Sequence, residues 1–272
     1  IYDGKPKSAT LPTFIRNCIN HACMLPLGAD FLLPAALLLR MALSEGDREF
    51  GVKYLSLAGN SLFLATLASG LALVVALLLA YAGRAHPGRP MAAVKRLASL
   101  GYAVPGTVIA VGALIPLTAL DHALIDWAET HLQLALGLVI TGSAIALIFA
   151  YLARFLAVAL NAVEASLARI RPSLDEAAKS LGASRLGLLA RVHVPLLSGG
   201  IVSGLLLVFV DVMKELPATI VLRPFNFETL ATQVYILAAD ERLAEAATPS
   251  LIIVAVGLIP VMLLSRTLRR RA

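Results

Sequence analysis

The most unusual residues of this sequence are three charged side chains near the end of an apolar stretch: Asp211, Lys214 and Glu215. On a helix that begins near Leu197, a rise of about 1.5 Å per residue places Asp211 about 21 Å from the helix start. Asp211 and Lys214 are three residues apart and can pair on one face, and Glu215 is placed so that two acids can flank one lysine. Ionisable groups buried at such depth in a membrane face a cavity or one another.

Three interpretations of this cluster stay open. The cluster lines a path or gate, with Pro217 just beyond it, or it neutralises itself and anchors a helix end. Asp211 and Glu215 also offer the oxygen ligands that a hard cation prefers, but a pathway that bound its cargo tightly would not release it. The residues alone do not choose between a gate and an anchor.

A second informative segment, residues 164–197, contains the run Glu176-Ala177-Ala178. The segment is too polar to cross a membrane, yet its composition favours helix. Gly182 interrupts the helical pattern after about two turns, and Pro195 marks the start of the next apolar run. We therefore expect two short helices that meet at a glycine and lie outside the membrane. Such an element is suited to docking a soluble partner, although an interfacial helix would give a similar pattern.

Catalytic motifs are absent from the sequence. It contains no G-x-x-x-x-G-K-[ST] phosphate loop and no H-E-x-x-H pair, so ATP has no binding motif here. Cys18, Cys23 and His21 offer three metal ligands, one short of a closed zinc site, and we interpret them as incidental. The remaining histidines fall in predicted loops, where each is expected at the surface: His86, His122, His131 and His193. We assign no catalytic residue, no metal site and no cofactor to this chain.

The composition is that of a membrane protein. Of the 272 residues, 59% are hydrophobic and only 15% are charged, against about 25% charged in soluble domains. The mean hydropathy is +0.84, and the apolar residues form runs long enough to cross about 30 Å of hydrocarbon. Lipid offers no partner for unpaired backbone groups, so each run is expected to be helical. The sequence predicts an all-α, polytopic protein with six membrane helices, at about 24–43, 55–82, 97–120, 134–153, 197–220 and 249–265.

The charges between these runs predict the orientation. Segments 84–96 and 154–193 and the C-terminal tail are rich in Lys and Arg, whereas segment 121–133 has neither and segment 221–248 is acidic. Because Lys and Arg are retained on the cytoplasmic side, the basic loops and both termini are expected there. The net charge of +6 is thereby explained by membrane orientation, without a nucleic-acid partner.

Two features within the runs concern helix packing. Pro105 removes a backbone donor beside Gly106, so the third run is expected to kink there; such a break can line a transport pathway or be a tolerated structural kink. Gly200 and Gly204 form a G-x-x-x-G pattern that lets another helix approach closely.

The loop between the fourth and fifth runs also carries a specific resemblance. Permeases of binding-protein-dependent ABC importers have a cytoplasmic motif of the form E-A-A-x3-G-x9-I-x-L-P. Here Glu176-Ala177-Ala178, then Gly182 and, after nine residues, Val192-His193-Val194-Pro195 are similar to that motif, with valine in place of isoleucine and leucine. The motif precedes the penultimate span, where the family places it.

The resemblance implies a type I ABC importer permease fold with a coupling-helix loop, residues 160–196. It implies that Glu176 contacts an ATPase subunit, that Ala177 and Ala178 pack tightly against it, and that Gly182 makes the turn. The implied partners are two ABC ATPase subunits, which bind ATP and Mg, a periplasmic substrate-binding protein and a second permease half or subunit. The implied location is the bacterial inner membrane.

Two further stretches resemble the ferric-iron branch of this family: Tyr102 to Gly106, and Asp211 to Thr219 followed by Leu222-Arg223-Pro224-Phe225. They imply Fe(III) as cargo, although related permeases carry thiamine, polyamines, phosphonates or sulfate. The chain resembles the second half of a longer permease, with a cytoplasmic segment or linker at 1–23, a six-helix domain at 24–266 and a basic tail at 267–272. An ion-coupled secondary transporter is one alternative, but it would leave the motif-bearing loop unexplained. A membrane scaffold without transport is another, which transport assays in proteoliposomes would distinguish.

Overall fold

The computed structural model describes residues 22, 24–45 and 52–269, and these residues form helices and connecting segments without a β-strand. The predicted all-α class is therefore confirmed. Nearly all of the predicted N-terminal segment 1–23 and the end of the tail, 270–272, lie outside the described residues.

Three helices form the centre of the bundle: α3 (Val52–Ala85), α6 (Ala144–Leu167) and α10 (Ser198–Met213), which pack against one another. The buried face of α3 is a stripe of small residues, Ala65, Ala68, Ala72, Ala76 and Ala80. Small side chains let helix backbones approach closely. On α10 the two glycines of the predicted pattern lie against α6, because a Cβ on Gly200 would be 2.3 Å from Ser166 Oγ and one on Gly204 would be 3.3 Å from Ala162 Cβ.

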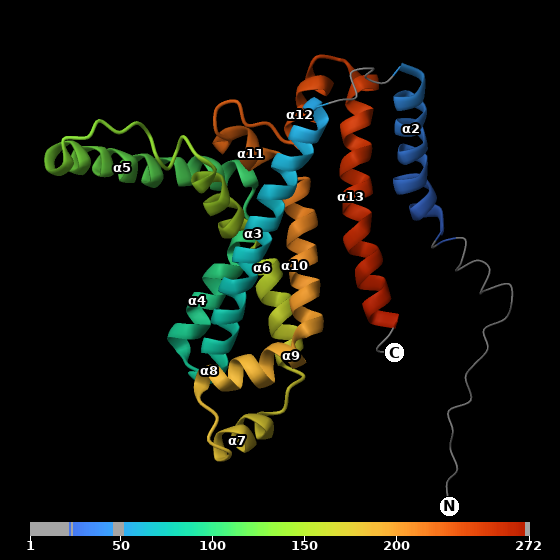
Figure 1. Ribbon diagram of the computed structural model, residues 1–272. Helices are drawn as coiled ribbons and strands as arrows, with labels where there is room; N and C mark the ends of the chain where they lie inside the picture. Colours follow the sequence, from blue (N-terminus) through green and yellow to red (C-terminus); the bar gives the residue numbers. More distant parts are fainter. Residues whose placement is uncertain (1–21, 23, 46–51, 270–272) are drawn as a thin grey trace, which may run out of the picture.

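The ends of the chain form a second layer beside this centre. The last helix, α13 (Leu243–Arg269), packs against α10, against α12 (Leu230–Ala239) and against α2 (Leu33–Glu45). A π-helical turn, η1 (Leu27–Leu32), precedes α2. Figure 1 shows α2 on the outer side of α13, away from the central helices.

The third predicted span is broken rather than kinked. It consists of α4 (Arg89–Leu100), a 3-10 turn at Gly101–Ala103 (η2) and α5 (Gly106–Leu132). The turn packs tightly on α6, since a Cβ on Gly101 would be 1.7 Å from the Ala153 carbonyl oxygen. From Gly106 the chain leaves the bundle sideways, and α5 projects away from the other helices (Figure 1). The predicted end at residue 120 is wrong, because the acidic segment 121–133 continues the helix to Leu132.

The fourth span also begins later than predicted. Residues 133–143 are not helical; they run back along α5, and α6 starts only at Ala144. The cause is the buried Asp121 carboxylate on α5, which accepts hydrogen bonds from the backbone N–H groups of Val139, Ile140 and Thr141. The Ser143 hydroxyl then accepts from the Ile145 N–H and caps α6. At its other end α6 continues to Leu167, so the connecting loop is shorter than the predicted 160–196.

The fifth span is bent at both ends. The helical segment Leu189–Leu196, which ends in the short helix α9 (Val194–Leu196), meets α10 at 68°. At its other end α10 stops at Met213, before a new helix, α11 (Pro217–Leu222), begins. Among the described residues four helices are long and apolar enough to cross a membrane, or five if the bent pair counts as one span, and α13 contains a shorter apolar helix at Leu243–Ile259. Six passes are consistent with this arrangement.

Candidate functional site

The predicted two-helix element lies at one end of the bundle, opposite α11 and α12 (Figure 1). It consists of α7 (Pro172–Ser180), followed by α8 (Arg185–Leu188) and a π-helical turn, η3 (Leu189–His193). Gly182 separates the helices with a φ of 80°. The Ala183 N–H donates to the Ala178 carbonyl at 3.0 Å, which is the 6→1 bond of a Schellman cap around a left-handed residue. The predicted turn at Gly182 is therefore confirmed.

One face of α7 is open to solvent. Glu176 and Ala177 are exposed and Ala178 is half-buried. Leu174 is 45% exposed and Leu181, just beyond the helix, is 88% exposed. Positions 174, 177 and 181 follow the spacing of one helix face, so α7 presents an apolar stripe beside a carboxylate. Such a surface is suited to contact with another protein.

The neighbouring residue Asp175 faces the other way, into the bundle. Its Oδ2 accepts from Arg84 Nε at 2.6 Å and its Oδ1 accepts from Arg84 Nη2 at 3.2 Å. The same Oδ1 lies 2.9 Å from His193 Nε2. Burial opposes ionisation of Asp175, but the hydrogen bonds from Arg84 and His193 outweigh it and lower the pKa of this carboxyl below its ordinary value.

Arg84 ties this carboxylate to the end of α6. It lies in the last turn of α3 and donates from Nη1 to the Leu167 carbonyl and from Nη2 to the Ile170 carbonyl, both at 3.0 Å. Carbonyls at a helix C-terminus lack partners within the helix, and a basic side chain can satisfy them. The residue predicted as an ordinary loop charge is therefore part of the packing between α3, α6 and α7.

His193 was predicted to be a surface residue, and this prediction is wrong. Its side chain is fully buried, its ring lies edge-on to Tyr81 with centroids 5.6 Å apart, and it bonds to Asp175. Pro195 lies in α9, in the turn that connects His193 to α10. Sequence reasoning missed Arg84, Tyr81 and His193 because Arg84 bonds to Asp175, 91 residues away, and Tyr81 contacts His193 from a different helix. The separation of 18 residues between Asp175 and His193 follows no helical spacing either.

A second polar cluster lies in the middle of the bundle, at the two helix breaks. Pro105 precedes α5 and Gly106 is its first residue. A Cβ on Gly106 would be 1.9 Å from Arg154 Nη1 and 2.7 Å from Glu215 Oε1. Only glycine leaves room for this approach. Arg154 lies within α6, 22% exposed, and not in a loop as its place in the predicted basic segment implied.

Glu215 joins the breaks together. Its Oε1 lies 3.1 Å from Arg154 Nη1 and accepts from the Ala218 N–H, also at 3.1 Å. Its carbonyl accepts from the Thr219 hydroxyl at 2.6 Å, and that hydroxyl in turn bonds to the Tyr151 hydroxyl. Pro217, at the first position of α11, has no N–H group of its own, so the Glu215 carboxylate binds the next N–H, that of Ala218.

The predicted cluster at 211–215 is therefore divided. Lys214 Nζ lies 3.0 Å from Asp211 Oδ1, as the spacing predicts, with the lysine side chain largely exposed. The expectation that Glu215 also flanks Lys214 is wrong, because the helix ends at Met213 and Glu215 turns toward α6. Its ion partner is Arg154, which lies on a different helix.

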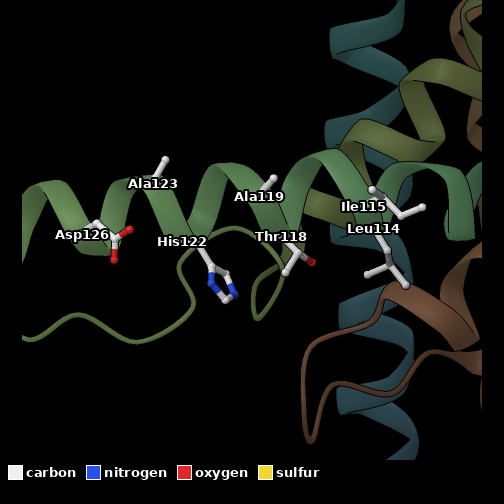
Figure 2. A pocket seen from close by; sticks show the side chains of 7 residues that line it. All are labelled: Leu114, Ile115, Thr118, Ala119, His122, Ala123 and Asp126. Atoms are coloured by element: carbon white, nitrogen blue, oxygen red, sulfur yellow. The ribbon is translucent and has the colours of Figure 1, made fainter.

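The surface of α5 carries a groove of about 740 Å³, with Thr118, His122 and Asp126 among the residues along it. Figure 2 shows Thr118 and His122 pointing to the same side of the helix. The described residues contain no group of three or more His, Cys, Asp or Glu side chains that could hold a metal ion. The groove is thus a property of the projecting helix, and no ligand set accompanies it.

Broken apolar helices joined by buried ion pairs, with a small polar helix exposed at one end, define a membrane-embedded transport component. The chain belongs to the family of binding-protein-dependent transport system inner membrane components, whose pattern matches residues 72–272.

Individual relatives agree with this assignment. The Fe(3+)-transport system permease protein FbpB 2 of Haemophilus influenzae is 28% identical over 214 residues, which cover 79% of this chain and 39% of the relative. The putative 2-aminoethylphosphonate transport system permease protein PhnV of Salmonella paratyphi A is 35% identical over 108 residues, which cover 40% of this chain and 41% of the relative. The matched part is thus less than half the length of either relative.

Solved structures show the same fold. A chain from the crystal structure of a bacterial ABC transporter involved in the import of the acidic polysaccharide alginate has a TM-score of 0.69 at 17% identity, covering 94% of this chain and 96% of that one. The alginate ABC transporter in complex with an alginate pentasaccharide-bound periplasmic protein gives a TM-score of 0.68 at 16% identity, covering 94% and 95%. These likenesses support the fold alone.

Proposed function

We propose that this chain is the permease of an importer driven by ATP hydrolysis on two separate ATPase subunits. The observation that carries the proposal is the outward face of α7, where Glu176 and Ala177 are exposed beside Leu181 on a helix fixed by the Gly182 turn. The chain has no phosphate loop of its own, so ATP and Mg belong to the partner subunits and no catalytic residue is assigned here.

Transport then proceeds by alternating access. ATP binding closes the two ATPase subunits, and their closure moves α7. The bundle helices respond by rocking between an inward-facing and an outward-facing state, as two packed arrangements of the same elements. Asp211, Lys214, Glu215, Pro217, Pro105 and Gly106 are proposed to line or gate the path, because the two helix breaks meet there.

The position of α5 supports a second permease half as a further partner. Only 17% of its most apolar window is buried, against 44% for α6 and 39% for α3. A helix that runs sideways from the bundle, with Val111, Ile115 and Trp127 exposed, needs cover from another membrane protein or from lipid. The Fe(3+)-transport system permease protein FbpB 2 is more than twice as long as the segment that matches this chain, which leaves room in that relative for such a second half.

Fe(III) is the proposed cargo, and an organophosphonate is the alternative. The match to the ferric-iron permease extends over 79% of this chain, and the match to the phosphonate permease over 40%. Uptake of radiolabelled Fe(III) and of 2-aminoethylphosphonate into proteoliposomes, each with a matching binding protein, separates the two. Uptake of the phosphonate without Fe(III) would overturn the iron assignment.

The orientation follows from charge. The α7 end carries the basic segments, so we place it and both termini in the cytoplasm of a bacterial cell. The opposite end, where Arg242 pairs with Glu245 at the start of α13, then faces a periplasmic substrate-binding protein.

Cross-linking tests the docking of α7. In a chain whose Cys18 and Cys23 are replaced by serine, Ala177→Cys should form a cross-link to the ATPase subunit in membranes. The matched variant Ala239→Cys, exposed at the other end of the bundle, should form none. Equal cross-linking at both positions, or none at position 177, would refute the proposal.

A further inference from the structure

The small helix α7 is attached to the rest of the chain chiefly through one side chain. A helix of nine residues is not stable alone in water, so contacts with other elements must hold it in place. Among the described side chains of α7, Asp175 is the one that hydrogen-bonds to another element, because the Ser180 hydroxyl bonds back to the Ala177 carbonyl within the helix.

Four segments meet at the Asp175 carboxylate. Arg84 connects Asp175 to α3, and its bonds to the Leu167 and Ile170 carbonyls connect the same cluster to the end of α6. The bond to His193 connects Asp175 to η3, which leads through α9 into α10. Hence one connected set of hydrogen bonds joins α7 to α3, to the end of α6 and to η3, the turn that leads into α10.

The geometry of these hydrogen bonds opposes movement of α7 relative to α3. A guanidinium that donates two bonds to one carboxylate fixes both distance and orientation, which a single lysine contact would not do. The network is shielded, since the side chain of Asp175 is 14% exposed and that of His193 is fully buried. A force on α7 therefore reaches α3 and the turn before α10 through these bonds.

We propose that Asp175 is a positioning residue of the transport cycle: the Arg84–Asp175–His193 cluster is the joint through which motion of α7 reaches the membrane helices. The inference rests on the proposed function and gives the adjacent residues Asp175 and Glu176 different roles. Glu176 faces outward to the motor subunit, and Asp175 faces inward to the bundle. Arg84 and His193 act through Asp175 and contact no cargo.

The first experiment uses the full chain alone in detergent and does not depend on a motor subunit. Amide hydrogen exchange of residues 172–180 is compared in Asp175→Asn, Glu176→Ala and Glu164→Gln. The last variant removes the acid of the Lys95–Glu164 pair, which joins α4 and α6 at the same end without touching α7. Exchange in α7 should rise about tenfold in Asp175→Asn, as expected for one charge-assisted hydrogen bond, and stay unchanged in the other two.

The second experiment uses the assembled transporter in proteoliposomes. Asp175→Asn and Arg84→Lys should each keep the ATPase subunits bound, because the outward face of α7 is intact, while cargo transported per ATP hydrolysed falls several-fold. The loss in the double variant should be smaller than the product of the two single losses, because both changes weaken the same Arg84–Asp175 connection. Arg84→Lys keeps the positive charge, so a loss there reports the forked geometry.

The outcomes separate the joint from the function itself. If the wild-type chain bound no ATPase subunit, the proposed function would fail while the exchange result still stood. Unchanged exchange in Asp175→Asn, or wild-type transport per ATP in both Asp175→Asn and Arg84→Lys, would overturn the joint. Losses that multiply in the double variant would also overturn it, since they would show two independent roles.

Discussion

The Arg154 guanidinium and the Glu215 carboxylate meet 3.1 Å apart at the point where two helices of the bundle break. Arg154 comes from the unbroken α6, and Glu215 from the segment between α10 and α11. Gly106, at the start of α5, lies against both side chains. One ion pair therefore holds together the two irregular segments that are the candidate path through the protein.

Removing one partner of this pair should be costly. Arg154→Met leaves Glu215, whose side chain is 5% exposed, without its ion partner, and breaking a buried pair in this way costs about 3 kcal/mol or more. The measurement is the free energy of unfolding in detergent by denaturant titration.

Lys214→Met provides the matched control. The Asp211–Lys214 pair has a lysine side chain that is 63% exposed, and an exposed pair contributes about 0–1 kcal/mol. A loss in Lys214→Met as large as that in Arg154→Met would contradict the assignment of the buried pair.

The glycine at the start of α5 should tolerate no side chain. Gly106→Ala would place a methyl group 1.9 Å from Arg154 Nη1, so the ion pair must move and transport should fall. Gly112→Ala, in the same helix with nothing within 4 Å of the new Cβ, should be neutral or stabilise the helix by about 0.5–1 kcal/mol. Transport rates and melting temperatures of the two variants check this contrast, and equal effects would refute it.

The turn after α7 should be sensitive to any side chain. Gly182 has a φ of 80°, where a residue with a Cβ is strained by about 1 kcal/mol, although the surrounding space is open. Gly182→Ala should therefore loosen the end of α7, raising the rate of hydrogen exchange at Ala183. Unaltered exchange there would show that the Schellman cap does not hold the turn.

The attachment of α7 should persist in mild acid. Because the pKa of Asp175 is lowered in the folded protein, its contribution to stability is fully present above the ordinary carboxyl pKa of about 3.9 and is lost as the pH falls through the lower folded value. The hydrogen-exchange rate of α7 is corrected for the intrinsic pH dependence of exchange. The difference in this rate between wild type and Asp175→Asn should change little between pH 7 and pH 5, and the two rates should converge only below about pH 4. Convergence already at pH 6 would contradict the shift.

Much of the fold follows from the sequence because it depends on local features. Apolar runs long enough to span lipid predict helices, Gly182 marks the break after α7, and Pro105 marks the break before α5. The pairing of Asp211 with Lys214 is equally local, since both lie within one helical turn.

The remaining features depend on contacts between distant segments. Arg154 follows an apolar run and therefore has the pattern of a loop charge, yet α6 extends beyond it and Glu215 neutralises it inside the bundle. The late start of α6 results from Asp121, a residue 18 to 20 positions before the amides it binds. His193 belongs to a polar segment, and only the fold shows that Asp175 and Tyr81 enclose it.

The central claim is that α7 transmits the work of an ATPase to the membrane helices through its exposed carboxylate. The direct measurement is transport per ATP hydrolysed in proteoliposomes for Glu176→Ala, beside Glu129→Ala, which removes an exposed acid on α5. We predict that Glu176→Ala folds normally and hydrolyses ATP with little transport, while Glu129→Ala behaves as wild type. Normal transport by Glu176→Ala would contradict the claim.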